Sequence, residues 1–204
     1  MTRVVKFLLF FLSSVGMTNT ALAERAVVGD AAPAFTGTDA DGKPHNLAAY
    51  RGKTVVLEWT NHDCPFVGKH YDSGNMQKLQ RRAVKDGVVW LSIVSSAPGT
   101  QGHVSPDEAK EISASDKAAH TAKILDPSGK IGRLYGATTT PHMYIIKPNG
   151  KLAYAGAIDS EPGWDESEIA GATNYVTMAL KAVKAGKAPN PSSTRPYGCS
   201  VKYD

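Results

Sequence analysis

Hydrophobic residues follow two patterns along the chain, and each predicts one kind of element. Short runs rich in β-branched and aromatic residues, typical of buried strands, occupy residues 53–59, 88–94, 124–126, 142–147 and 152–158. Apolar positions at helical spacing predict helices over residues 66–85, 105–119, 129–135 and 166–185. Strands that alternate with helices in this order predict an α/β fold, with a mixed central sheet and helices on both faces.

Local signals refine the limits of these elements. An Asp-Gly pair at residues 41–42 predicts a hairpin-like turn before the first long strand. Ser105 is the expected N-cap of a helix, with Pro106 at its first position and Glu108 completing a capping box. Ser73 and Gly74 are expected to weaken or kink the helix over residues 66–85.

The first 23 residues have the pattern of a secretory signal peptide. Basic residues Arg3 and Lys6 precede an apolar run over residues 7–12, and Ala21-Leu22-Ala23 predicts cleavage before Glu24. An uncleaved membrane anchor is the alternative, but the run is well short of the roughly 20 residues that cross a bilayer. We therefore expect a secreted protein, located in a bacterial periplasm where disulfides persist.

Composition predicts one domain after this segment. With 42% hydrophobic and 21% charged residues the chain has the balance of a globular protein. We expect a single domain over residues 24–185 and a tail over residues 186–204, whose prolines and glycines suggest mobility. Removing the two basic residues of the signal brings the 23 basic residues close to the 19 acidic ones. This balance argues against a nucleic-acid or membrane-surface partner.

Any thiol chemistry must use Cys64 or Cys199, because the chain has only two cysteines. Cys64 follows the predicted strand at 53–59 and precedes a predicted helix. Unpaired amide groups and the positive end of a helix dipole favour a thiolate there. The polar residues before Cys64 and the proline after it do not resemble a buried core position. Cys199 lies in the tail between apolar residues, so part of the tail is expected to dock.

Five segments together resemble the thioredoxin-fold superfamily and, within it, the secreted peroxiredoxin-like branch known as AhpC/TSA or redoxin proteins. The segments are Gly29–Phe35, Val55–Thr60, Asn61–Phe66, Thr139–Tyr144 and Tyr197–Lys202. The resemblance implies a thioredoxin-like fold in which the Cys64 thiol faces a cis-proline, Pro141. It also implies that an extended partner chain pairs with the backbone of Thr140, beside the sulfur.

The sequence departs from both catalytic patterns of these families. Thioredoxins have a second cysteine three residues after the first, where this chain has Val67. Peroxiredoxins require a threonine three residues before the cysteine and a proline four residues earlier, where this chain has Asn61 and Leu57. The peroxidase pattern is therefore absent, and a resolving thiol has to come from elsewhere.

Cys199 is the candidate for that missing thiol, and three interpretations stay open. It can resolve a mixed disulfide formed by Cys64, form a permanent structural disulfide with Cys64, or remain unpaired or pair with another molecule. A permanent disulfide that closes so long a loop would contribute on the order of 4 to 5 kcal/mol to stability. It would also abolish thiol catalysis.

Histidines near Cys64 raise a third class of function. His62, His70 and His142, together with the thiolate, would suit copper or zinc, as in copper chaperones of the Sco type that share this fold. Those proteins use two loop cysteines, and this chain has one. His62 and Asp63 can instead tune the ionisation of Cys64.

The sequence therefore predicts a thiol-disulfide oxidoreductase that acts on protein thiols or disulfides. Its site is formed by Cys64, Cys199, Thr140 and Pro141, with no cofactor and no metal. A thiol peroxidase that reduces peroxides and a non-catalytic or copper-binding module are the alternatives. The sequence predicts neither the direction of electron flow nor an oligomeric state.

Overall fold

The structure is a computed structural model that describes residues 25–204. The predicted signal peptide and its cleavage site lie outside the described residues. Within residues 25–204, every helix is too short or too polar to cross a membrane.

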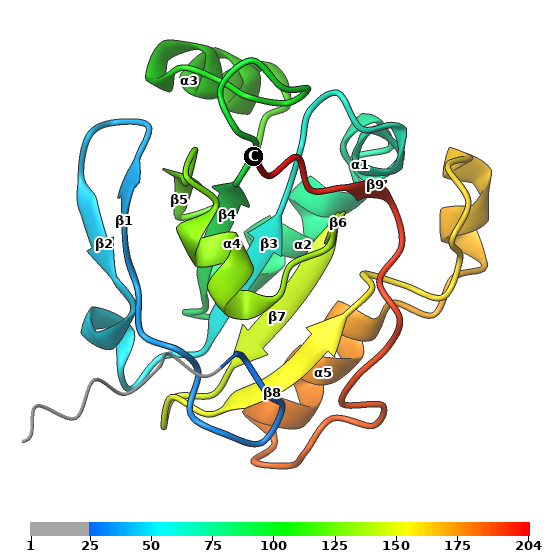
Figure 1. Ribbon diagram of the computed structural model, residues 1–204. Helices are drawn as coiled ribbons and strands as arrows, with labels where there is room; N and C mark the ends of the chain where they lie inside the picture. The colour runs from blue at the N-terminus through cyan, green and yellow to red at the C-terminus, as the bar shows by residue number, and fades with distance from the viewer. Residues whose placement is uncertain (1–24) are drawn as a thin grey trace, which may run out of the picture.

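A seven-stranded mixed sheet forms the centre of the molecule (Figure 1), and its strand order is β2-β1-β5-β4-β3-β7-β8. Strands β3, β4 and β5 run parallel, whereas β7 is antiparallel to both β3 and β8. The strands are β1 Thr36–Asp39, β2 Pro44–Asn46, β3 Val55–Trp59, β4 Val89–Val94, β5 Ala122–Leu125, β7 His142–Ile146 and β8 Leu152–Gly156. The predicted α/β class with a mixed central sheet is confirmed.

Helices cover both faces of this sheet. They are α1 Pro65–Asp72, α2 Asn75–Lys85, α3 Pro106–Ser115, α4 Lys130–Tyr135 and α5 Tyr175–Lys184, with 3-10 helices η1 Leu47–Tyr50 and η2 Glu166–Ala170. In Figure 1, α4 lies in front of the sheet and α2 and α5 lie behind it. Alternate residues of β3 enter opposite cores: Leu57 packs on the side of α4, and Val56 packs on the side of α1, α2 and α5.

Two predicted helices are divided in the structure. The helix expected over residues 66–85 breaks at Gly74, which has a φ of +72°, so α1 and α2 are separate. The single helix expected over residues 166–185 is wrong. This segment forms η2 and α5 instead. The first helix ends at its C-cap Gly171, and the second begins at its N-cap Asn174, whose side chain accepts a hydrogen bond from the Thr177 amide (2.8 Å).

The helix with the predicted capping box has it, but the helix is shorter than expected. The Ser105 hydroxyl accepts from the Glu108 amide, and the Glu108 carboxylate accepts from the Ser105 amide. The helix ends at Ser115 rather than near Ala119. The Ala119 amide donates to the Gln80 side-chain oxygen (2.7 Å) instead of to a carbonyl oxygen of the helix.

The tail is docked along its length, although its composition suggested mobility. From the end of α5 it passes the edge of β8 and returns to the top of the molecule in Figure 1. There β9, Cys199–Ser200, pairs antiparallel with β6, Thr139–Thr140, in a separate two-stranded sheet. Beyond it, the Lys202 carbonyl oxygen accepts from the Ala97 amide (2.8 Å), and the Tyr203 hydroxyl donates to the Ala137 carbonyl oxygen (2.8 Å).

Candidate functional site

Cys64 lies where β3 passes into α1. It is the N-cap residue of α1, with extended backbone angles, and Pro65 occupies the first turn, where its missing N–H leaves no helical hydrogen bond unmade. The Cys64 carbonyl oxygen accepts from the amides of Val67 and Gly68. Its Sγ donates to the carbonyl oxygen of Thr140 at 3.2 Å. The thiol therefore faces Thr140, the residue before Pro141.

The Cys64 side chain is buried, with 1% of its surface exposed, which the sequence did not predict. Apolar residues of α1 and α2 lie beneath it in the same core cluster, and Tyr197 and Cys199 of the tail pack against that cluster. The local sequence is polar on one side of Cys64, but the tail and the core together cover the sulfur.

Thr140 and Pro141 are joined by a cis peptide bond at the start of β7. Across the short β6–β9 ladder, Thr140 pairs with Cys199 and Thr139 pairs with Ser200. The Thr140 hydroxyl also donates to the Cys199 carbonyl oxygen (3.5 Å). The backbone edge that was expected to take a partner's extended chain is thus occupied by the protein's own tail.

Gly198 permits this close approach. Its φ of +130° lies in the range that disfavours other residues, and a Cβ atom at this position would overlap the carbonyl oxygen of Thr140. The tail backbone therefore rests directly on the residue that binds the Cys64 thiol.

Cys64 and Cys199 are both free thiols, and Cys199 is partly exposed. Burial raises the pKa of Cys199, and a hydrogen bond to Cys64 and the charge of Cys64 raise it further, to about 12. The Cys199 thiol is therefore protonated near neutral pH.

Tyr197, Asp159 and His70 form a buried hydrogen-bonded group that we call the tail anchor. The Tyr197 hydroxyl donates to Asp159 Oδ1 at 2.5 Å and lies 3.1 Å from His70 Nε2. Burial lowers the pKa of His70 to about 3, with a further contribution from the charge of Lys69, so the imidazole is neutral near pH 7. Its Nδ1 accepts a hydrogen bond from the side-chain Nδ2 of Asn75 (2.9 Å). The ring proton is therefore on Nε2, which donates a hydrogen bond to the Tyr197 hydroxyl.

The tail anchor has no signature in the sequence. Tyr197 belongs to an ending that resembles a family pattern, and the position of His70 near Cys64 suggests a metal ligand instead. Neither a motif nor a spacing relates residue 70 to residues 159 and 197. Their association depends on the path of the folded tail.

Glu58 is a second buried polar centre that the sequence pattern did not single out. It lies in β3 with 0% of its surface exposed, and four side chains donate to its carboxylate. The donors are Tyr71 (2.8 Å), Gln80 (3.1 Å), Trp90 (2.6 Å) and Ser92 (2.9 Å). A glutamate inside a run of apolar strand residues was the available signal. This network ties β3, β4, α1 and α2 together beneath the site.

The histidines considered for metal binding do not converge. His62 Nε2 lies 3.2 Å from Asp63 Oδ1 at the surface, and His70 belongs to the tail anchor. His142 is buried with its ring against Tyr144, and burial lowers its pKa to about 4. Within residues 25–204, no three histidine, cysteine, aspartate or glutamate side chains are grouped to hold a metal ion.

The two positions that differ from the peroxidase pattern have other roles. Leu57 is fully buried in the core beside α4. The Asn61 side-chain oxygen accepts from the Asp63 amide (2.9 Å), so it closes the loop that leads to Cys64. These contacts organise the loop and supply none of the groups of the peroxidase pattern.

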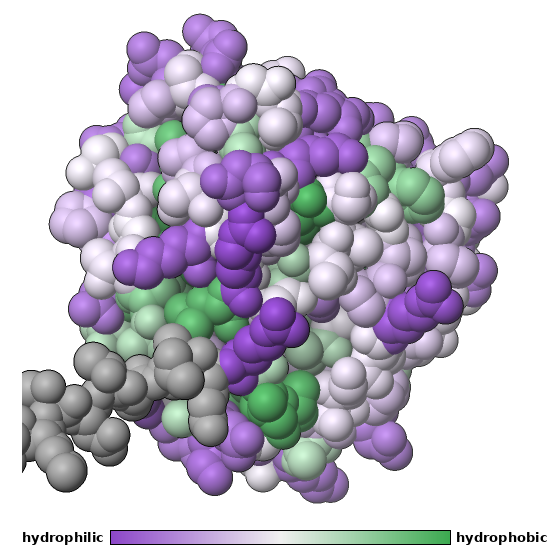
Figure 2. Space-filling view, viewed as in Figure 1, coloured by the Kyte–Doolittle hydropathy of each residue, from purple (hydrophilic) through white to green (hydrophobic). Residues whose placement is uncertain are grey.

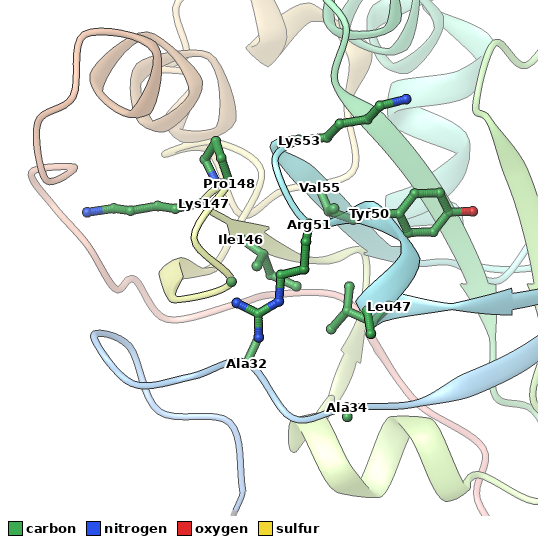
Figure 3. A pocket seen from close by; sticks show the side chains of 12 residues that line it. Ala32, Ala34, Leu47, Tyr50, Arg51, Lys53, Val55, Ile146, Lys147 and Pro148 are labelled. Atoms are coloured by element: carbon green, nitrogen blue, oxygen red, sulfur yellow. The ribbon is translucent and has the colours of Figure 1, made fainter.

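A small cavity of about 40 Å³ lies at the other end of the sheet, near the start of β3 and the end of β7 (Figure 3). The side chains of Lys53 and Lys147 point away from it, and Arg51 points across it toward Ala32. Cys64 follows the opposite end of β3, so this cavity is separate from the thiol site. On the face drawn in Figure 2, apolar areas are small and divided by polar side chains.

The strand order, the cysteine at the start of α1 and the adjoining Thr140–Pro141 bond define a thioredoxin-fold protein with a thiol site. The chain belongs to the AhpC/TSA family, whose model matches residues 28–155. It is 27% identical over 157 residues to the thiol-disulfide oxidoreductase ResA of Geobacillus thermodenitrificans, covering 71% of this chain and 80% of that protein.

Two solved structures show the same fold. A hypothetical protein from Sinorhizobium meliloti has a TM-score of 0.73 and 20% identity, covering 89% of this chain and 97% of the other. The thioredoxin domain of a thiol-disulfide oxidoreductase from Bacteroides vulgatus has a TM-score of 0.51 and 20% identity, covering 71% of this chain and 96% of the other.

Proposed function

We propose that this protein is a thiol-disulfide oxidoreductase in which Cys64 and Cys199 form the redox pair. The observation that carries the proposal is that both cysteines contact the same residue, Thr140. Cys64 Sγ donates to its carbonyl oxygen at 3.2 Å, and Cys199 is its partner in the antiparallel ladder. Cys199 thus takes the position of the second thiol that the loop after Cys64 lacks.

The cycle joins two states of this pair. In the reduced state, the Cys64 thiolate attacks an external disulfide, and one of the external sulfurs leaves as a thiolate. Cys199 then gives up its proton and attacks Cys64, which releases the second external thiolate and forms the Cys64–Cys199 disulfide. Two cysteine thiols are oxidised while one external disulfide is reduced to two thiols. External thiols in excess reduce this disulfide again, and two external thiols are then oxidised to one external disulfide.

The charge distribution supports Cys64 as the nucleophile of the reduced state. The raised pKa of Cys199 keeps that thiol protonated near neutral pH, which makes it a poor nucleophile in the reduced state. The similarity to ResA supports thiols and disulfides as the substrates. Together with the predicted signal peptide, it also supports a location outside the cytoplasm, in the periplasm.

The test is to measure the redox state and the exchange activity of the same preparation. Equilibration with mixtures of reduced and oxidised glutathione, followed by thiol alkylation and peptide mapping, should show one reversible Cys64–Cys199 disulfide. The reduced protein should accelerate the reduction of insulin by dithiothreitol, and Cys64→Ser and Cys199→Ser should each lose most of this acceleration. Hydrogen peroxide consumption is measured alongside.

A disulfide that resists the whole glutathione range would instead indicate a structural bond. Rapid peroxide turnover without insulin reduction would indicate a peroxidase. Either result would refute the proposed exchange function.

A further inference from the structure

The two sulfurs of the proposed redox pair differ in exposure. Cys64 is 1% exposed and belongs to a core cluster, whereas Cys199 is partly exposed on the strand that lies over it. An external thiol that approaches the docked protein therefore meets Cys199 first.

We propose that external thiols reduce the oxidised protein by attacking Cys199, so that Cys199 is the entry sulfur and Cys64 the leaving group. This inference rests on the proposed Cys64–Cys199 pair, and it names which sulfur an external thiol reaches. It reverses the assignment expected from the sequence, in which the partner is bound at Cys64 and Cys199 only resolves the adduct.

The direction of attack supports this order. Thiol-disulfide exchange is in line, so the incoming sulfur approaches on the side opposite the bond that breaks. Attack on Cys64 would have to come from the side facing away from Cys199. Apolar residues of α1 and α2, including Val67 and Tyr71, pack with Cys64 in the core cluster. Attack on Cys199 comes from the side facing away from Cys64, and Cys199 is the partly exposed residue of the two.

The tail is held so that this difference persists. Gly198 lies against the Thr140 carbonyl oxygen, and the Tyr197 hydroxyl is hydrogen-bonded within the tail anchor. After Cys199, the Val201 amide donates to the Thr138 carbonyl oxygen (3.0 Å). These contacts lie before and after Cys199. They keep the tail over Cys64 on both sides of the reacting residue.

The leaving group also favours this order. In the first step an external thiolate forms a bond to Cys199 Sγ, the Cys64–Cys199 bond breaks, and Cys64 leaves as a thiolate at the N-terminus of α1. Burial raises the pKa of Cys199, and a thiolate of high pKa is a poor leaving group. A second external thiolate then attacks the external sulfur of the mixed disulfide. One external disulfide is formed, and Cys199 is released and takes up a proton.

The experiment mixes oxidised wild-type protein with reduced glutathione and, after short intervals, adds an excess of N-ethylmaleimide, which blocks the remaining glutathione and the freed cysteine. Acid quenching and peptide mapping then locate the glutathione and the maleimide. We expect glutathione on Cys199 and maleimide on Cys64, with at least about ten Cys199 adducts for each Cys64 adduct. The same oxidised protein unfolded in guanidinium chloride is the control, in which this preference should largely disappear.

The outcomes separate the two proposals. Glutathione mainly on Cys64, or equally on both cysteines, would overturn the entry role of Cys199 and leave the redox pair standing. If no Cys64–Cys199 disulfide forms in the starting material, both proposals fail. A folded protein whose preference equals that of the unfolded control would show that the preference arises in the local sequence, and it would refute the structural argument.

Discussion

Thr140 contacts both cysteines at once: its carbonyl oxygen accepts a hydrogen bond from the Cys64 thiol, and its backbone pairs with Cys199. The position next to Pro141 is therefore filled from within the chain. This relationship makes the reactivity of Cys64 dependent on the position of the tail, and the first two predictions follow from it.

Gly198→Ala should lift the tail from Thr140. The added Cβ would overlap the Thr140 carbonyl oxygen, and the residue would be strained at a φ of +130°. We expect a loss of about 1–3 kcal/mol in the free energy of unfolding. In a Cys199→Ser background, alkylation of Cys64 should become at least about tenfold faster as the tail opens.

Gly186→Ala is the matched control, because Gly186 also has a positive φ of +72° but has open space at the Cβ position. It should lose stability without increasing Cys64 alkylation. Equal alkylation rates in the two variants would contradict the role of Gly198 in covering the thiol.

Tyr197→Phe should release the tail anchor while preserving the ring. Asp159 would lose the hydroxyl donor at 2.5 Å and keep the Glu161 amide on the same oxygen (3.1 Å). Because the carboxylate stays buried, we expect a loss of about 1–3 kcal/mol in the free energy of unfolding. Alkylation of Cys64 in the Cys199→Ser background should also become faster.

Tyr203→Phe tests whether this effect is specific to the anchor. It removes a hydrogen bond from the same tail, to the Ala137 carbonyl oxygen, on the other side of Cys199. Denaturant unfolding and alkylation rates of the two variants are compared. A larger increase in Cys64 alkylation with Tyr203→Phe than with Tyr197→Phe would count against the anchor.

Acid should destabilise the protein through its buried histidines. The pKa of His70 is lowered from 6.5 to about 3, so between these values the unfolded chain binds a proton that the folded protein excludes. The stability is therefore present above pH 6.5 and is lost as the pH falls toward 3. The loss should reach about 1.4 kcal/mol per pH unit at this site. His142, with its pKa lowered to about 4, contributes in the same direction.

Urea unfolding between about pH 7 and pH 5 measures this slope, because it reports the free energy of unfolding directly. His70→Gln should make the slope shallower than in the wild type. His62→Gln, on the exposed surface, is the matched control, and a slope as shallow as that of His70→Gln would count against the role of burial. An unchanged slope in His70→Gln would show that His70 does not carry the acid sensitivity.

Glu58→Gln should weaken the core beneath the site. The carboxylate accepts from four side chains, and an amide would direct its NH2 group at donors such as the Trp90 indole or the Ser92 hydroxyl. We expect a loss of about 1–3 kcal/mol in the free energy of unfolding, measured by denaturant titration. Glu111→Gln, on the exposed surface of α3, should change stability little. A Glu58→Gln variant as stable as the wild type would contradict the importance of this network.

The sequence predicts the central sheet well because strand residues carry their signal locally. Residues 53–59 are rich in β-branched and apolar side chains, and β3, Val55–Trp59, lies within this range. The prediction of one helix over residues 166–185 was wrong. The apolar spacing continues across Gly171 and Asn174, but one helix ends at the first of these residues and another begins at the second.

The site was predictable only in part. Cys64 before Pro65 at the start of a helix is a local motif, so its place could be read from the sequence. Its burial could not, because the residues that cover it come from the tail. The tail anchor likewise unites residues 70, 159 and 197, which no helical or strand periodicity relates. Non-local packing, rather than local propensity, determines which sulfur is accessible.

The pairing of Cys199–Ser200 with Thr139–Thr140 is a separate two-stranded sheet, hydrogen-bonded to none of the seven central strands. Detaching the residues after Tyr197 would therefore break a short ladder, a few further backbone hydrogen bonds such as Ala97 to Lys202, and some side-chain contacts, without opening the main sheet. The folded domain can in this way expose or cover its most deeply held thiol at a small fraction of the cost of global unfolding. The last few residues are therefore expected to open independently of the central sheet.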